Sequence, residues 1–149
     1  MNTTKIITLL CLLLLLAACG GGNATVSDAT GGANAATLPP TLSLETATLP
    51  LGDVPNGRIV ERDVTVTNSG GAPLVIESLT TSCGCTTATL DTMTIAPQAT
   101  ATLHIAFDSG AHGPDLRGEL LRQVVLVSND PAQPETLVEL TANITDPAS

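Results

Sequence analysis

Residues 59–81 read IVERDVTVTNSGGAPLVIESLTT, and this stretch decides the fold class. From Ile59 to Asn68, apolar and polar side chains alternate, and a period of two residues is typical of a half-buried β-strand. Ser69-Gly70-Gly71 supplies the small residues of a turn, and Leu74 to Thr81 is a second run rich in β-branched residues. The stretch therefore predicts two consecutive β-strands joined by a short connection.

The same pattern continues on both sides of this stretch. Short β-branched runs separated by turn residues extend from Thr41 to Ile144, and no segment keeps a 3.6-residue apolar period long enough for a helix. About seven strands in roughly 107 residues, at 41–147, predict an all-β fold, a single immunoglobulin-like antiparallel sandwich. The expected strands are 41–48, 59–68, 74–81, 86–90 with a short piece at 93–95, 100–107, 116–128 and 135–144, and the expected turns are 52–53, 55–57 and 129–131.

Composition limits the partners that such a domain can bind. The chain has 149 residues, a formal net charge of −9, no Trp or Tyr, and Phe107 as its single Phe. Proteins that bind single-stranded nucleic acid stack bases on aromatic rings, and this chain has almost none. Five Lys and Arg residues against fourteen Asp and Glu residues leave no basic face for duplex phosphates. The composition therefore argues against a nucleic-acid partner and predicts a core of small aliphatic side chains.

The N-terminus carries a targeting signal. Ile6 to Leu16 is apolar except for Thr8 and is too short to cross a bilayer, which needs about twenty residues. It runs into Leu16-Ala17-Ala18-Cys19, which resembles the lipobox of bacterial lipoproteins. The resemblance implies that residues 1–18 are a signal peptide and that Cys19 receives a covalent lipid. An ordinary signal peptide with an incidental Cys is the alternative.

Cleavage before Cys19 would leave 131 residues, and the loss of Lys5 would take the formal charge from −9 to −10. Residues 19–40 are rich in Gly, Ala and small polar side chains and predict a flexible tether spanning roughly 25 Å. The expected location is extracytoplasmic and membrane-anchored, either at the outer membrane and periplasm or on the outer face of the cytoplasmic membrane. Disulfide bonds persist in these compartments.

Several short motifs resemble the bacterial domain-of-unknown-function family numbered 1573. They are VTVTNSGGAPLVI at 64–76, TSCGCTT at 81–87, IAP at 95–97, Phe107-Asp108, and VSNDP at 127–131. The resemblance covers about residues 49–144 and implies an immunoglobulin-like fold, related to major sperm protein and Hydin-type domains, at the cell surface. It implies no activity. Pro97-Gln98 stands where the family usually has Pro-Gly, so we expect a less tight turn there.

Cys83 and Cys85, separated by Gly84, are the main candidates for a chemically reactive or metal-binding site. We expect Gly84 to permit the close approach of the two side chains. One interpretation is a strained, reducible disulfide that exchanges with other thiols. A second is a soft-metal site for copper or zinc, which would need help from further ligands. A third is a pair of small buried residues that shape a turn. The candidate additional ligands are His104, His112 and Met93.

Another possible catalytic arrangement has weaker support in the sequence. Ser82, His104 and Asp108 are the residue types of a hydrolase triad, but no Gly-x-Ser-x-Gly motif surrounds the Ser. His104 also falls on the polar side of its alternating strand. We therefore expect no enzyme and no resident cofactor apart from the lipid on Cys19.

The sequence predicts a lipid-anchored, non-catalytic immunoglobulin-like domain of the cell envelope. Such a domain would bind the membrane through its lipid and another envelope protein through an edge strand, or build an envelope assembly. The alternative is a thiol-redox or soft-metal protein that uses Cys83 and Cys85.

Overall fold

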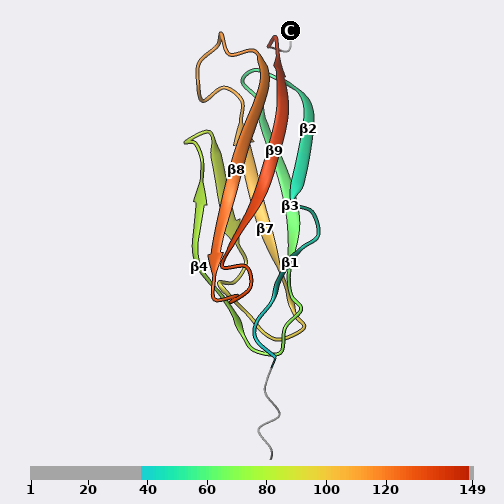
Figure 1. The fold of residues 1–149 in the computed structure, drawn as a ribbon. Coiled ribbons are helices and arrows are strands. Elements are labelled where there is room, and N and C mark those ends of the chain that lie inside the picture. Colours follow the sequence, from blue (N-terminus) through green and yellow to red (C-terminus); the bar gives the residue numbers. More distant parts are fainter. Residues whose placement is uncertain (1–37, 148–149) are drawn as a thin grey trace, which may run out of the picture. The chain divides into compact units, whose positions relative to one another are not determined.

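The computed structural model describes residues 38–147, so the predicted signal peptide, Cys19 and most of the predicted tether lie outside the described residues. The described part folds as two β-sheets packed face to face (Figure 1), and the predicted all-β immunoglobulin-like sandwich is confirmed. It holds no helix that is long and apolar enough to cross a membrane. The strands are β1 (Leu42–Leu44), β2 (Thr48–Pro55), β3 (Ile59–Asn68), β4 (Leu74–Thr81), β5 (Thr86–Leu90), β6 (Thr94–Ile95), β7 (Thr100–Asp108), β8 (Gly118–Ser128) and β9 (Glu135–Thr145).

One sheet has the order β1-β3-β7-β5 and the other has the order β2-β9-β8-β4-β6. There are nine strands where we expected about seven, because β2 forms at 48–55, where mainly turns were expected, and because the short piece expected at 93–95 forms β6. β1 pairs with β3 in the antiparallel sense, whereas β2 pairs with β9 in the parallel sense. The sandwich is therefore mixed, and the expectation of a purely antiparallel one is corrected.

The turn expected at Gly52-Asp53 is also corrected, because both residues lie inside β2. The pairing of β2 with β9 shifts register between Pro50 and Gly52, and Gly52 has a φ of 72°. A glycine at positive φ lets a strand absorb an extra residue as a bulge. The signals that predicted a turn therefore mark a bulge in a continuing strand.

The core lies between the sheets and consists of the inward side chains of alternating strands. Val64 and Val66 of β3 are fully buried, and so is Leu103 of β7. Phe107, the one aromatic ring, is 1% exposed. Arg62 belongs to the same alternating set as Val64 but is exposed. Burial of each such aliphatic side chain contributes about 1.5–3 kcal/mol, which makes a core without further rings possible.

Asn68 fixes the end of β3 where the first described residues enter the sandwich. Its side chain is fully buried, and its Oδ1 accepts the N–H groups of Gly70 and Thr41 at 3.0 and 3.3 Å. Its Nδ2 donates to the carbonyls of Ala72 and Ile95 at 2.8 and 3.0 Å. This motif residue therefore serves the fold by satisfying four backbone groups at once.

Gln98 completes the same end of the sandwich. Its φ is 60°, in the left-handed region that favours glycine, and its Nε2 donates to the carbonyls of Ser69 and Gly70. Its own N–H donates to the carbonyl of Asn68 at 2.9 Å. The side-chain hydrogen bonds offset the cost of the left-handed backbone, so the turn keeps the conformation that Gly would adopt there.

Candidate functional site

The Cys-Gly-Cys segment is the crossover from one sheet to the other, since it joins β4 to β5. At its start, the N–H of Ser82 donates to the carbonyl of Gln123 at 2.9 Å, and the N–H of Gln123 donates to Ser82 Oγ at 2.9 Å. At its end, the N–H of Asp108 donates to the carbonyl of Cys85 at 2.8 Å. The crossover is thus tied to β8 in one sheet and to β7 in the other.

The structure joins Cys83 and Cys85 in a disulfide, with the two Cα atoms 5.3 Å apart. Cys85 is 2% exposed and belongs to the core, whereas Cys83 is only partly buried. Beyond its two chain neighbours, a Cβ added at Gly84 would meet no atom within 4 Å, and Gly84 has no positive φ. That Gly84 permits the close approach of Cys83 and Cys85 stays a prediction.

Polar groups surround the two sulfurs. Arg122 of β8 directs its Nε–H at Cys85 Sγ, 3.3 Å away. The Thr86 hydroxyl lies 3.4 Å from Cys83 Sγ and 3.8 Å from Cys85 Sγ. Arg122 has no sequence signal that links it to the cysteines, because 37 residues separate it from Cys85 and only the pairing of β8 brings them together.

His112 is the metal-ligand candidate that the structure brings to the cysteines. One of its ring nitrogens and the two sulfurs all lie within 4.8 Å of one another. A soft metal binds thiolates, so the disulfide would have to be reduced before these three residues could act as ligands. In the oxidised form, the cluster is a disulfide with an exposed imidazole beside it.

His104 lies elsewhere, on the outer face of β7. Its Nδ1 is 2.8 Å from Asp63 Oδ1 and its Nε2 is 2.9 Å from Asp91 Oδ1, so both ring nitrogens face carboxylates. Hydrogen bonds to Asp91 and Asp63 raise the pKa of His104, and the bond from His104 lowers the pKa of Asp91. The arrangement favours the imidazolium, which can donate from both nitrogens. Met93 is exposed just before β6.

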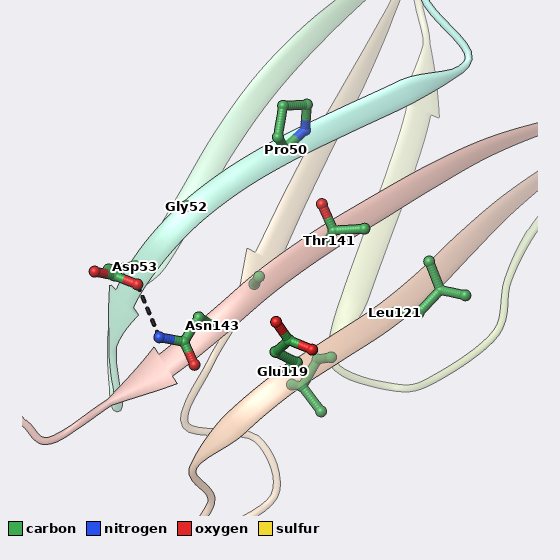
Figure 2. A pocket seen from close by; sticks show the side chains of 9 residues that line it. Pro50, Gly52, Asp53, Glu119, Leu121, Thr141 and Asn143 are labelled. Carbon is green, nitrogen blue, oxygen red and sulfur yellow. Dashed lines mark hydrogen bonds between the residues drawn. The ribbon is translucent and has the colours of Figure 1, made fainter.

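Two hollows lie on the outer faces of the sandwich. Figure 2 shows the first, which crosses β2, β9 and β8 and is lined by Asp53 on one side and by Glu119 and the exposed Leu121 on the other. Its dashed line is the hydrogen bond from Asn143 Nδ2 to Asp53 Oδ1, 2.8 Å long. The second hollow lies over β3, β7 and β5 and is lined by Glu61, Asp63, Thr87, Thr89, His104, Ile105 and Ala106. The second hollow is acidic and borders an edge strand.

Five exposed strand segments of the two sheets carry features that discourage pairing with another chain. β1 and β6 have only three and two residues. β2 contains Pro50 and Pro55 and a register shift. The part of β3 that extends beyond β1 carries the charged residues Glu61, Arg62 and Asp63. The part of β4 that extends beyond β6 follows a register shift, between Ile76 and Ser78, in the pairing of β4 with β8.

β5 differs from these segments. Its sequence TTATL has no charge and no Pro, and its pairing with β7 shows no register shift. Cys85 and Asp91, on either side of β5, form backbone hydrogen bonds with β7. In an antiparallel pair only every second residue directs its N–H and C=O at the partner strand, so those of Ala88 and Leu90 point away from β7. Within the described residues, no loop or side chain bonds these groups. β5 therefore offers a short, uncharged strand edge.

Comparisons with known proteins identify a family and a fold. The family model described as "Protein of unknown function (DUF1573)" matches residues 42–144. Among curated proteins, none matches the sequence.

Three solved structures resemble the domain. A protein of unknown function from Porphyromonas gingivalis W83 is 23% identical with a TM-score of 0.63, over 74% of this chain and 50% of that one. The secreted serine protease VesC from Vibrio cholerae is 15% identical with a TM-score of 0.52, over 75% and 24%. The ASH/PapD-like domain 7 of human CEP192 is 9% identical with a TM-score of 0.55, over 72% and 87%. This chain spans half or less of the first two, and all three likenesses concern the fold alone.

Proposed function

The chain belongs to the DUF1573 family, whose function is unknown, and we propose that it is a lipid-anchored, non-catalytic domain of the cell envelope that binds another envelope protein. The observation that carries this proposal is the open edge of β5. A strand edge binds an extended segment through backbone hydrogen bonds and needs no special side chains. This suits a domain with one aromatic residue, because aromatic anchors are otherwise the usual centres of an interface.

The partner that fits β5 is an extended segment with a Lys or Arg on its outward face. Such a segment would lie beside Thr87 and Thr89, whose small side chains leave room for a long cationic one. Asp91 and the acidic hollow are next to these threonines. A second copy of this chain is disfavoured, because its net charge of −9 makes like charges meet.

The non-catalytic part of the proposal is supported by the hydrogen bonds of the residues that could have formed a hydrolase triad. Ser82 Oγ accepts the N–H of Gln123, and His104 is engaged by Asp63 and Asp91. These bonds leave neither His104 nitrogen directed at Ser82.

The binding proposal can be tested with a photo-reactive residue placed at Thr87 of the full chain in cells. We expect covalent products with a partner at Thr87 and none at Thr141, an exposed residue of β9, which has a strand on each side. Ala88→Pro removes a backbone N–H from the free edge and should abolish the products, whereas Ala88→Ser keeps it and should preserve them. Products that persist in Ala88→Pro, or that form at Thr141 alone, would refute binding at β5.

The anchor is tested separately. Cys19→Ser removes the sulfur that would carry the lipid, and we expect the protein to move from the membrane fraction to the soluble fraction. Metabolic labelling with a fatty acid should mark the unmodified sequence and not the variant. Membrane retention of Cys19→Ser without label would refute lipid anchoring.

A further inference from the structure

The two sulfurs of the crossover are not equivalent. Cys85 is 2% exposed within the core cluster, whereas Cys83 is partly exposed. A thiol that arrives from solution therefore meets the Cys83 sulfur first. Thiol–disulfide exchange depends on which sulfur is attacked and on how well the other sulfur leaves as a thiolate.

Arg122 is placed to stabilise Cys85 as a thiolate when the disulfide breaks. Its Nε–H points at Cys85 Sγ from 3.3 Å, and its Nη1 donates to the carbonyl of Leu121 at 2.8 Å, which holds the guanidinium in place. Within residues 38–147, no carboxylate lies within 4.0 Å of Arg122. A cation that is not paired with a carboxylate thus faces Cys85, and a guanidinium beside a sulfur stabilises its thiolate.

We propose that Cys83–Cys85 is a thiol-exchange site that accepts electrons from a dithiol of another extracytoplasmic protein. Cys83 is the sulfur attacked, Cys85 is the leaving thiolate, and Arg122 stabilises it. His112 takes the proton from the incoming thiol, since its ring nitrogen lies within 4.8 Å of both sulfurs on the exposed side. This site is distinct from the β5 edge and does not depend on the binding proposed there.

The exchange balances without any other oxidant. The donor thiolate forms a bond to Cys83 Sγ, and the Cys83–Cys85 bond breaks with its electron pair on Cys85. The donor's second thiol then attacks the donor sulfur of this mixed disulfide and releases Cys83 as a thiolate. Two protons from the donor end on Cys83 and Cys85. The pair gains two electrons, and the donor dithiol becomes a disulfide.

The test uses the oxidised full chain with dithiothreitol under anaerobic conditions, and alkylation with peptide mass mapping follows the thiols of Cys83 and Cys85. We expect Arg122→Gln to slow reduction about tenfold, because a hydrogen bond to the leaving thiolate is lost. Arg62→Gln changes the net charge equally and should leave the rate unchanged. If Arg122→Gln loses the β-sheet circular dichroism signal, Arg122→Lys, which keeps the charge, should give an intermediate rate.

A monothiol locates the attacked sulfur. With glutathione and an acid quench, we expect the mixed disulfide on Cys83. His112→Gln should slow the reaction, and raising the pH should restore the rate because the donor thiol then ionises without help. Three results would overturn the proposal: glutathione found on Cys85, equal rates for the unmodified chain and Arg122→Gln, or a disulfide that is reduced only after unfolding.

Discussion

The carboxylate of Asp130 accepts the backbone N–H of Leu42 at 2.8 Å, across 88 residues of chain. Its other oxygen accepts the N–H groups of Ala132 and Gln133 at 2.8 and 3.2 Å. Asp130 is 2% exposed and lies in the turn between β8 and β9, whereas Leu42 begins β1 in the opposite sheet. One buried carboxylate therefore closes the end of the sandwich at which the described chain enters.

Asp130→Asn should destabilise the domain by about 2 kcal/mol, because hydrogen bonds to a charged group contribute about 1.5–3 kcal/mol. The amide keeps one acceptor oxygen and places an N–H₂ where the carboxylate accepted an N–H. Urea unfolding at pH 7 measures the change. Asp146→Asn is the matched control, since Asp146 is largely exposed and makes a surface ion pair with Arg117, so its loss should change stability by less than about 1 kcal/mol. Equal effects of the two substitutions would contradict the role of Asp130.

The contribution of Asp130 should depend on pH. Burial acts to raise the pKa of Asp130, but hydrogen bonds from Leu42, Ala132 and Gln133 outweigh it, so the pKa lies below the ordinary value of 3.8. A group whose folded pKa is depressed contributes stability above its unfolded pKa and loses it as the pH falls through the folded pKa. The stability difference between the unmodified chain and Asp130→Asn should therefore shrink below pH 3.8. A difference that stays constant down to pH 2 would speak against this linkage.

Gly70 and Gly84 should respond differently to the same substitution. A Cβ at Gly70 would lie 2.1 Å from the carbonyl oxygen of Pro39, so the backbone would have to shift. A Cβ at Gly84 would meet nothing within 4 Å beyond the two chain neighbours. We expect Gly70→Ala to destabilise the domain by about 2 kcal/mol or more, as overpacking and strain do. Gly84→Ala should be within about 0.5 kcal/mol of neutral. Thermal unfolding of both variants measures the difference, and a destabilised Gly84→Ala would show that Gly84 has a steric role.

The bounds of individual strands followed from the local sequence pattern where that pattern is clear. The bounds of β3 and β4 agree with the alternation of residues 59–68 and the β-branched run at 74–81. The pattern failed at β2, because its partner β9 lies about ninety residues further along and pairing with it turns Gly52 into a bulge. A local pattern contains no information about such a distant partner.

Some residues of the candidate site could be predicted from the sequence, and others are brought to it only by the fold. Cys83 and Cys85 are adjacent enough for the sequence to mark them as a pair. Arg122 and His112 come from β8 and the loop before it, and only the packing of the sheets places them at the sulfurs. The contacts of His104 with Asp63 and Asp91 likewise arise from strand pairing and had no sequence signal.

His104 should titrate above its ordinary value. Hydrogen bonds to Asp91 and Asp63 raise its pKa above 6.5, so the stabilisation from the imidazolium is present below pH 6.5 and is lost as the pH rises through the folded pKa. A ¹H–¹³C NMR titration of the ring measures this directly. Asp63→Asn with Asp91→Asn should return the pKa of His104 toward 6.5. An unchanged His104 titration in the double variant would contradict the two contacts.

The disulfide should be dispensable to the scaffold. A cross-link that closes a three-residue loop restricts the unfolded chain little, by about 1.6 kcal/mol on a loop-closure estimate. We expect the Cys83→Ser, Cys85→Ser double variant to fold, with a loss of about 1–3 kcal/mol once the buried hydroxyl at position 85 is included. Circular dichroism and urea unfolding give the measurement.

Dithiothreitol-reduced unmodified protein is the control, because it loses the disulfide without a change of residue. The Cys83→Ala, Cys85→Ala variant separates the effect of the buried hydroxyl from the effect of the lost disulfide. If the reduced protein and both variants unfold, the crossover disulfide holds the two sheets together, and the domain cannot survive reduction as an exchange site requires.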